Sequence, residues 1–371
     1  MPEPVYLDHN ATAPVRPAAA EAAAAAMQAV GNASSVHRFG RAARRRVEEA
    51  REQVAALVGA DPAQIVFTAG GTEANNTVLA AYAGARVVVS AVEHDSVLRA
   101  LDGAEILPVD GRGRVDLAAL QAALCRPPAP ALVSVMLANN ETGVIQPVPE
   151  IAEMAHAYGA RVHCDAVQAV GKIPVDMARL GVDLMTLSAH KLGGPQGAGA
   201  LVVADEAPLP AYLHGGGQER GYRAGTENVP AIAGFGAAAA EAAAERERMA
   251  ELADWRDRME AAAAARVPDV VRHGAGAPRL PNTSCLGMPG LPAETQLMKL
   301  DLAGVAVSSG SACSSGKVHD SHVLTAMGAP EPGSAIRVSL GWSTAPADLD
   351  RFLAVWSDLA AKRRPRRDAA A

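Results

Sequence analysis

Lys191 has the most informative chemistry in this 371-residue sequence. The chain contains only five lysines against 29 arginines, so arginine carries most of its positive charge. Lys191 follows the strand-like run 184–187 in the order Ser-Ala-His-Lys, and Gly193, Gly194 and Pro195 come soon after it. A lysine amine, unlike a guanidinium, can lose its proton and act as a nucleophile. We therefore interpret Lys191 as a reactive amine and not as a surface charge.

Four other strand-like runs are also followed by polar residues. In chain order these are Gly70, Gly71 and Thr72 after 65–68, Glu93 and His94 after 86–90, Asn139 to Gly143 after 131–137, and Asp165 and Gln168 after 160–164. In an open parallel sheet, ligands bind beyond the carboxyl ends of the strands. We therefore expect these side chains and Lys191 to meet in one site at one edge of a sheet.

The glycine pair Gly70-Gly71 with Thr72 offers backbone N–H groups, a hydroxyl and a helix start, which together can bind phosphate. The segment lacks the lysine of a nucleotide-binding P-loop and is not GxGxxG, so it does not favour a nucleotide. Taken singly, these glycines are also compatible with a tight turn, Asp165 with a helix cap, and His94 with a structural histidine. A reactive lysine, a phosphate cradle and a strand-end carboxylate together indicate pyridoxal 5'-phosphate (PLP).

Cys313 lies in the segment 308–317, which consists mainly of serine and glycine and has neither helical nor strand periodicity. This composition is typical of a mobile loop, on which a thiol could reach a substrate. Two alternatives remain at this point: a small buried apolar residue, or a metal ligand with His319 and His322, whose spacing matches no zinc finger. We expect the other cysteines to pack as small apolar residues; these are Cys125, Cys164 and Cys285.

Five segments together resemble the cysteine desulfurases of the class V aminotransferase family, in the long-loop form that serves iron–sulfur clusters. The segments are 6–12, 68–76, 163–168, 188–191 and 223–228, and the likeness runs from Tyr6 to about Leu353. The resemblance implies a PLP enzyme and a homodimer that converts L-cysteine to L-alanine. The sulfur would pass to an enzyme cysteine as a persulfide and then to an acceptor protein such as an iron–sulfur scaffold. A selenocysteine lyase or another class V enzyme is the alternative, and a non-catalytic sulfur carrier is a second one.

The resemblance also implies a role for each matching residue. Lys191 would form the Schiff base and move protons, Cys313 would accept sulfur, and His94 would stack on the ring and act as an acid and base. The remaining roles are Asp165 at the pyridine nitrogen, Gln168 at the ring hydroxyl, Gly71, Thr72, Ser188 and His190 at the phosphate, Thr226 at the phosphate from the partner subunit, and Asn140 and Arg337 at the substrate carboxylate. A guanidinium suits that last role because its fork matches a carboxylate with two parallel bonds.

The elements that would position these residues follow an α/β pattern. Short apolar runs alternate with helical stretches such as 72–82, 116–124 and 148–158, which predicts a mostly parallel sheet covered by helices on both faces. A long helix over 231–265 should lead into a smaller α+β domain with strands over 281–287 and 304–309 and a closing helix over 349–361. The resemblance places this arrangement in PLP fold type I. We predict a large PLP-binding domain over 16–245 and a small domain over 246–371, on which 1–15 pack.

Composition narrows the class of protein further. Apolar residues make up 49% of the chain, which excludes a disordered protein, and the formal charge of −6 gives no support for nucleic-acid binding. Neither a signal peptide nor a membrane span is visible, so we expect a cytoplasmic protein with free thiols. The basic run 362–367 is interpreted as a solvated tail.

Overall fold

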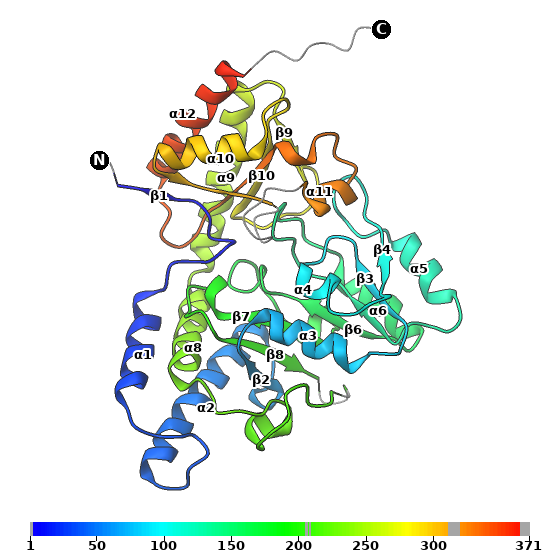
Figure 1. Ribbon diagram of the computed structural model, residues 1–371, viewed down its shortest axis with the longest axis vertical. Helices are drawn as coiled ribbons and strands as arrows, with labels where there is room; N and C mark the ends of the chain where they lie inside the picture. Colours follow the sequence, from blue (N-terminus) through cyan, green and yellow to red (C-terminus); the bar gives the residue numbers. More distant parts are fainter. Residues whose placement is uncertain (1–2, 205–206, 208, 311–319, 364–371) are drawn as a thin grey trace.

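The computed structural model describes residues 3–204, 207, 209–310 and 320–363 (Figure 1). Its centre is a seven-stranded sheet in the order β2-β8-β7-β6-β5-β3-β4. Strand β8 is antiparallel to both of its neighbours, and every other neighbouring pair among β7, β6, β5, β3 and β4 is parallel. The strands are β2 (Ile65–Thr68), β3 (Val87–Ser90), β4 (Glu105–Leu107), β5 (Leu132–Ser134), β6 (Arg161–Asp165), β7 (Leu184–Ser188) and β8 (Gly199–Val203).

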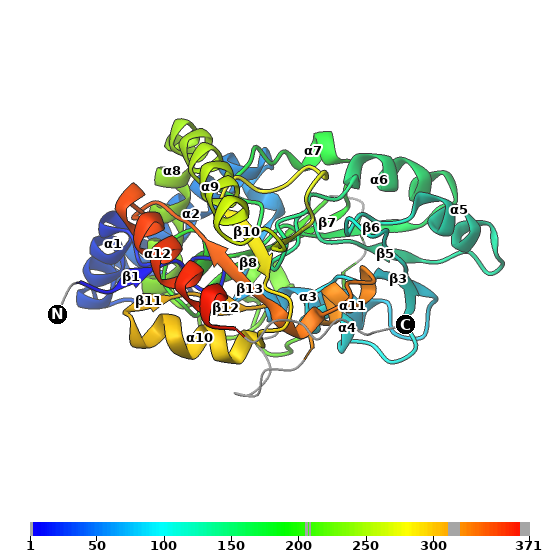
Figure 2. The ribbon, with the colours of Figure 1, turned by 90° about the horizontal axis from the view of Figure 1, so that it is seen from above.

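Helices cover both faces of this sheet. They are α1 (Pro17–Gln28), α2 (Arg38–Val58), α3 (Gly71–Ala81), α4 (Asp95–Leu98), α5 (Leu117–Cys125), α6 (Val148–Ala157), α7 (Met177–Leu180) and α8 (Val229–Ala244). Successive strand residues alternate between the faces: Val88 packs in one hydrophobic cluster with residues of α2, α6 and α8, and Val87 and Val89 pack in another with α3. Figure 2 shows the central strands between α6 and α7 on one side and α3 and α4 on the other. The predicted α/β class with a mostly parallel, helix-covered sheet is confirmed.

The second part of the chain forms a separate hydrophobic cluster around a four-stranded antiparallel sheet, in the order β12-β13-β10-β9. Its elements are β9 (Val271–His273), β10 (Thr283–Gly287), β11 (Val305–Ala306), β12 (Ser308–Ser309), β13 (Ala335–Ser339), α9 (Arg246–Arg266), α10 (Ala293–Leu302), α11 (His322–Ala326) and α12 (Pro346–Lys362). The N-terminal strand β1 (Val5–Tyr6) pairs in parallel with β11, and Val5 and Leu7 are buried in the same cluster as Phe352 and Trp356.

Two expected elements are divided in the structure. The predicted helix 231–265 is instead α8 and α9, which meet at Glu245. Glu245 accepts a hydrogen bond from the buried Arg16 guanidinium at 2.7 Å, so a residue far away in the sequence holds the point where the helix breaks. The predicted strand 304–309 is β11 and β12, because Val305 and Ala306 pair with β1 while Ser308 and Ser309 pair with β13.

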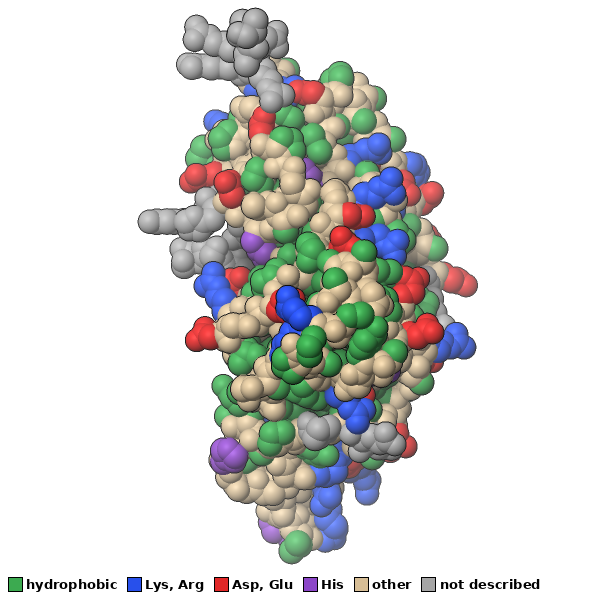
Figure 3. All heavy atoms as spheres, turned by 90° about the vertical axis from the view of Figure 1, so that its right-hand side faces the viewer, with side chains coloured by type: hydrophobic (Ala, Val, Ile, Leu, Met, Phe, Trp, Pro, Cys, Tyr) green, Lys and Arg blue, Asp and Glu red, His purple; other side chains and the backbone are tan. Residues whose placement is uncertain are grey.

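The domain boundary at residue 245 stays a prediction. The separate hydrophobic clusters and the helix break at Glu245 support it, and the pairing of Val5–Tyr6 with β11 supports the placement of residues 1–15. Among the described residues, no helix combines the length and the apolar character needed to cross a bilayer. On the face shown in Figure 3, acidic and basic side chains are interspersed with apolar ones.

Candidate active site

A cavity of about 320 Å³ opens at the carboxyl ends of the central strands. It is lined by ten of the residues predicted from the sequence: Gly71, Thr72, His94, Asn140, Asp165, Gln168, Ser188, His190, Lys191 and Arg337. Asp165 and Ser188 are the last residues of β6 and β7, while Gly71 and Thr72 begin α3. The strand ends therefore meet in one site, as the sequence pattern indicates.

The start of α3 forms one end of the cavity. Gly70 precedes the helix, so the backbone N–H groups of the first helical turn are available to an anion. Ser188 and His190 line the same cavity, and the His190 Nδ1 lies 3.2 Å from the Thr12 hydroxyl. Burial, together with the charges of Lys191 and Lys172, lowers the pKa of His190 to about 4. His190 is therefore neutral at neutral pH and can donate one hydrogen bond to a phosphate.

Asp165 lies in the middle of the cavity and is buried. Its Oδ1 accepts from the backbone N–H of Val167 at 3.0 Å, and its Oδ2 accepts from the Asn75 side chain at 2.8 Å. Asn75 also donates to the Ser96 hydroxyl at 2.9 Å, and this hydroxyl lies 2.8 Å from the Nδ1 of His94. A polar chain thus joins Asp165 to His94.

His94 caps the start of α4. Its Nδ1 accepts from the backbone N–H of Ser96 at 3.1 Å, which requires that nitrogen to be unprotonated. In the neutral ring the proton therefore resides on Nε2. His94 also lines the cavity, so the ring can contact a ligand there.

Lys191 ends a short 3₁₀ turn that begins directly after β7. Its ammonium donates to the backbone carbonyls of Asn10 at 2.6 Å and Ala11 at 2.8 Å. The Gln168 amide donates to the same Asn10 carbonyl at 2.9 Å. The N-terminal segment therefore contacts two of the predicted cofactor residues.

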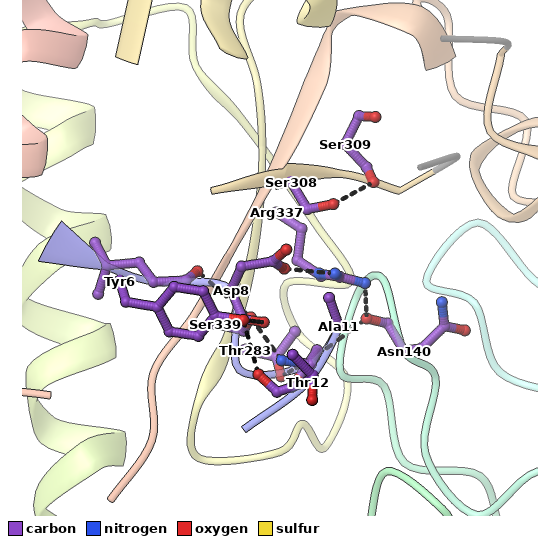
Figure 4. Close-up of polar contacts among 12 residues, drawn as sticks. Tyr6, Asp8, Ala11, Thr12, Asn140, Thr283, Ser308, Ser309, Arg337 and Ser339 are labelled. Atoms are coloured by element: carbon purple, nitrogen blue, oxygen red, sulfur yellow. Dashed lines mark hydrogen bonds and ion pairs between the residues drawn. The ribbon is translucent and has the colours of Figure 1, made fainter. Parts of the chain in front are cut away.

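Arg337 from β13 forms the other end of the cavity (Figure 4). Its Nη2 donates to Asp8 Oδ1 at 2.7 Å and its Nη1 donates to the carbonyl of Asn140 at 3.1 Å. Asp8 is held beside β13 because its neighbours pair with Ser339, through His9 N to Ser339 O at 3.2 Å and Ser339 N to Leu7 O at 2.8 Å. The guanidinium is thereby fixed at the cavity wall with a neutralising carboxylate beside it.

Several lining residues were not selected by the sequence analysis. Asn75 belongs to the segment 68–76, and its position one helical turn after Gly71 could have indicated that it faces the site. Asn10 lines the cavity and Asp8 pairs with Arg337; both lie in the segment 6–12, but no local pattern shows that this segment reaches β13. Ser96 follows His94 by two residues and gives only an ordinary helix-start pattern.

Two predicted site residues are not among those lining the cavity. Thr226 lies in a neighbouring cavity of about 190 Å³, with Thr68, Gly197 and Arg223. The Arg223 guanidinium is paired with Glu73 of α3 at 2.9 Å, which ties the segment carrying Thr226 to the start of α3. Cys313 lies outside the described residues, as does His319 of the alternative metal site; within the described part of the chain, no group of acidic, histidine or cysteine side chains could hold a metal ion.

The other three cysteines differ from one another. Cys164 and Cys285 are buried, and burial raises the pKa of both thiols, which suits an unreactive packing role. The expectation for Cys125 was wrong: it is exposed at the end of α5, where its sulfur lies 3.1 Å from the Tyr158 hydroxyl. Cys125 is the last residue of α5, where the side chain faces solvent and has no hydrophobic core to pack against.

The chain belongs to the aminotransferase class V family, whose model matches residues 5–352. The names of similar proteins specify an activity within this family. The chain is 45% identical over 370 residues to a cysteine desulfurase of Cereibacter sphaeroides, with 95% of each chain covered. It is 42% identical to the IscS-like cysteine desulfurase of Mycobacterium tuberculosis, with 97% of each covered. The X-ray structure of a NifS-like protein from Rickettsia africae superposes with a TM-score of 0.90 at 34% identity, covering 97% of this chain and all of that one.

The cofactor of this family is PLP, and the cavity suits it. The start of α3 with Ser188 and His190 fits a phosphate, and the Asp165 carboxylate fits a protonated pyridine nitrogen. Asn75 Oδ1 is buried without a hydrogen-bond partner among the described residues, as is expected where a polar ligand completes the site. Fold type I, expected from the sequence, agrees with the structural relatives.

Proposed function

We propose that this chain is a PLP-dependent cysteine desulfurase that converts L-cysteine to L-alanine and transfers the sulfur to Cys313 as a persulfide. The observation that carries the proposal is the placement of Lys191, Asp165 and Arg337 in one cavity. These residues supply an amine, a carboxylate and a guanidinium, which suit the cofactor aldehyde, the pyridine nitrogen and the substrate carboxylate respectively. The relatives named cysteine desulfurase support the choice of reaction.

Bound PLP supplies an electron sink for the bonds at the Cα of an amino acid. The protein supplies orientation and proton transfer. Arg337 and the Asn140 side chain bind the substrate carboxylate at the β13 end of the cavity, while Asp165 keeps the pyridine nitrogen protonated. Lys191 would hold the cofactor covalently, and its free amine would move a proton at the substrate Cα. The backbone carbonyls of Asn10 and Ala11 can receive its amine in the released state, because they accept its hydrogen bonds in the structure.

His94 is suited to protonate the product side of the reaction. Its Nδ1 is engaged by Ser96, so its Nε2 is the nitrogen that can exchange a proton with a ligand in the cavity. Thr72, Ser188 and His190 hold the phosphate with the start of α3, and Gln168 binds the ring oxygen. We assign Thr226 to the phosphate of a partner subunit in a homodimer.

The transfer of sulfur from L-cysteine to Cys313 needs no added oxidant. The Cys313 thiolate attacks the sulfur of L-cysteine, so an S–S bond forms and the bond between sulfur and the substrate Cβ breaks. The carbon keeps the electron pair and takes up a proton, and the products are L-alanine and the Cys313 persulfide. The thiolate form is required because it is the nucleophile. The assignment of Cys313 depends on the sequence alone, namely the serine- and glycine-rich segment 308–317.

The persulfide would then pass to an acceptor protein, for which we propose an iron–sulfur scaffold, in the cytoplasm. Selenocysteine remains the second candidate substrate, because its amino and carboxyl groups would meet the same residues.

The proposal is tested with the purified protein loaded with PLP. Wild type should be yellow and should form alanine from L-cysteine, Lys191→Ala should lose the absorbance of the covalently bound cofactor, and Cys313→Ser should keep it but stop alanine formation. Cys125→Ser is the matched control, because Cys125 is an exposed thiol remote from the cavity, and it should react as wild type does. Normal alanine formation by Cys313→Ser would disprove the role of that thiol. Parallel assays with selenocysteine decide between the two substrates.

A further inference from the structure

Lys172 is a buried lysine that the reaction described above does not use. It lies in the turn after β6, four residues beyond Gln168, and is 9% exposed. Within the described part of the chain, no carboxylate forms an ion pair with its ammonium. Burial and the neighbouring charges of Lys191 and Arg337 lower its pKa well below the usual value. Burying an amine costs free energy of folding, and hydrogen bonds from its N–H groups to protein acceptors offset that cost.

Its partners are the side-chain oxygens of two amides. The Lys172 Nζ donates to Gln168 Oε1 at 2.7 Å and to Asn10 Oδ1 at 3.0 Å. The Gln168 Nε2 in turn donates to the Asn10 backbone carbonyl at 2.9 Å. A flipped Gln168 amide would place its oxygen against that carbonyl, which is repulsive, and would take the acceptor Oε1 away from the N–H of Lys172. Lys172 therefore fixes which way the amide of Gln168 points.

The consequence concerns what Gln168 offers to the cavity. Its oxygen is turned towards Lys172 and one amide proton is donated to Asn10, so the amide proton that remains for a ligand is the second proton of Nε2. Gln168 lines the cavity. It thus presents a hydrogen-bond donor, which favours a deprotonated oxygen on the ligand opposite.

Asn10 is fixed in the same way. Its Oδ1 accepts from Lys172 and from Asn282 at 3.1 Å, and its Nδ2 donates to Thr283 Oγ1 at 2.9 Å and to the Asn140 carbonyl at 3.1 Å. These contacts hold the Asn10 peptide, whose carbonyl accepts from Lys191. One buried amine is therefore connected to both the ring-binding glutamine and the lysine that binds the cofactor.

We propose that Lys172 is a positioning residue of the cofactor site, which fixes Gln168 as a donor to the ring oxygen of PLP and fixes, through Asn10, the carbonyl that receives the Lys191 amine. The inference rests on the proposed PLP-dependent function. Among the described residues, the ionisable groups around this cluster come from several elements. They are Lys191 and His190 after β7, Arg337 on β13, Asp8, His9 and Arg16 in the N-terminal segment, Asp165 on β6, and Arg256 and Arg279 at the cavity beside Lys172.

The test is a pH titration of the absorbance of bound PLP, which reports the protonation of the cofactor independently of turnover. In Lys172→Met the amide of Gln168 can turn and the nearby amine is lost. Both changes stabilise the protonated form of the cofactor, so the midpoint should rise by about one pH unit. Dissociation of PLP should also be faster, by about tenfold. Lys172→Arg should stay close to wild type, since a cavity of about 350 Å³ adjoins Lys172 and gives room for the larger donor.

Two further variants keep the test decisive. Lys299→Met is the matched control, because Lys299 is exposed on α10, and its midpoint should equal that of wild type. Gln168→Glu keeps an acceptor for Lys172 but presents only oxygen to the cavity, so it should raise the midpoint even if Lys172→Met fails to fold. The double variant Lys172→Met with Gln168→Glu should show less than the sum of the two shifts.

An unchanged midpoint in Lys172→Met with a lower melting temperature would mean that Lys172 only stabilises the fold, and would overturn the inference. An unchanged midpoint in Gln168→Glu would do the same. A wild-type protein that binds no PLP would instead refute the proposed function, so the two failures are distinguishable.

Discussion

The two sides of the cavity are built in different ways. On one side, which we call the strand-end side, every residue either ends a strand of the seven-stranded sheet or follows one within a few residues; these residues are Thr72, His94, Asp165, Ser188 and Lys191. On the other, which we call the assembled side, Asp8, Asn10, Asn140, Thr283 and Arg337 come from segments far apart in the sequence and are joined by hydrogen bonds (Figure 4). The strand-end side is positioned by local chain geometry, whereas the assembled side exists only when both hydrophobic clusters have packed.

The comparison separates two tasks. The strand-end side carries the groups proposed to bind the cofactor, and the assembled side carries those proposed to bind the substrate carboxylate. Damage to the first should therefore reduce kcat or the binding of PLP, while damage to the second should mainly raise KM.

The largest effect is expected for Asp165→Asn on the strand-end side. An amide cannot neutralise a protonated pyridine nitrogen, so kcat for alanine formation should fall by roughly 100- to 1000-fold. PLP should still bind, because the phosphate contacts remain. Asp254→Asn, at an exposed position on α9, is the control and should leave kcat unchanged. A loss below tenfold would contradict the assignment of Asp165.

Arg337→Lys on the assembled side should have the next largest effect. The lysine keeps the charge but loses the fork that binds a carboxylate with two bonds, and a hydrogen bond to a charged group contributes about 1.5–3 kcal/mol. We expect the KM for L-cysteine to rise roughly 10- to 100-fold while kcat changes little. Steady-state kinetics measures both, with Arg258→Lys on the exposed face of α9 as the control. A fall in kcat with an unchanged KM would contradict the assignment of substrate binding to the assembled side.

Gly199→Ala on the strand-end side should weaken PLP binding indirectly, because residue 199 contacts the turn before α3. A Cβ at Gly199 would lie 2.7 Å from the backbone of Gly70, so the turn before α3 would have to move. Overpacking of this kind costs about 1–3 kcal/mol, which predicts a PLP dissociation constant roughly tenfold higher. In Gly111→Ala the nearest atom lies at 3.8 Å, and equilibrium titration should give a wild-type constant for that variant. Equal affinities for both variants would show that the turn is not rigid.

The smallest effect is expected from His163, beneath the strand-end side. Its ring contacts Ser134 and Thr186 at 2.8 and 3.0 Å, and burial lowers its pKa to about 3. Below pH 6.5 the unfolded chain takes up a proton on His163 that the folded chain does not. The free energy of unfolding should therefore decrease as the pH is lowered from 6.5 towards 4, by at most about 1.4 kcal/mol per pH unit for this residue.

Urea unfolding of wild type and His163→Gln between pH 6.5 and 4 measures this contribution. The variant should show the shallower pH dependence, since glutamine takes up no proton. Identical slopes would mean that His163 is not held neutral.

The same contrast explains what the sequence could predict. Polar residues directly after apolar runs identify the strand-end side, because a parallel sheet brings such positions to one edge whatever the rest of the chain does. Arg337 was recognised only through the family resemblance, whereas Asn140 also belongs to the polar segment that follows the run 131–137. The partners Asp8, Asn10 and Lys172 have no local pattern, since their roles depend on which distant segments meet. The helix break at Glu245 escaped prediction for the same reason: it is held by Arg16, and the intervening alanines and glutamates favour a continuous helix.

The pairing of β1 with β11 also determines when an active molecule can first exist during synthesis. Val5 pairs with Val305, which the ribosome adds 300 residues later. The seven-stranded sheet ends at Val203 and can form from the nascent chain, but residues 5–9 must wait for β11 and β13 before their backbone has strand partners. Contacts of such long sequence separation form late. A chain that is still incomplete, or one truncated before β13, can therefore fold its sheet without gaining a site that binds substrate.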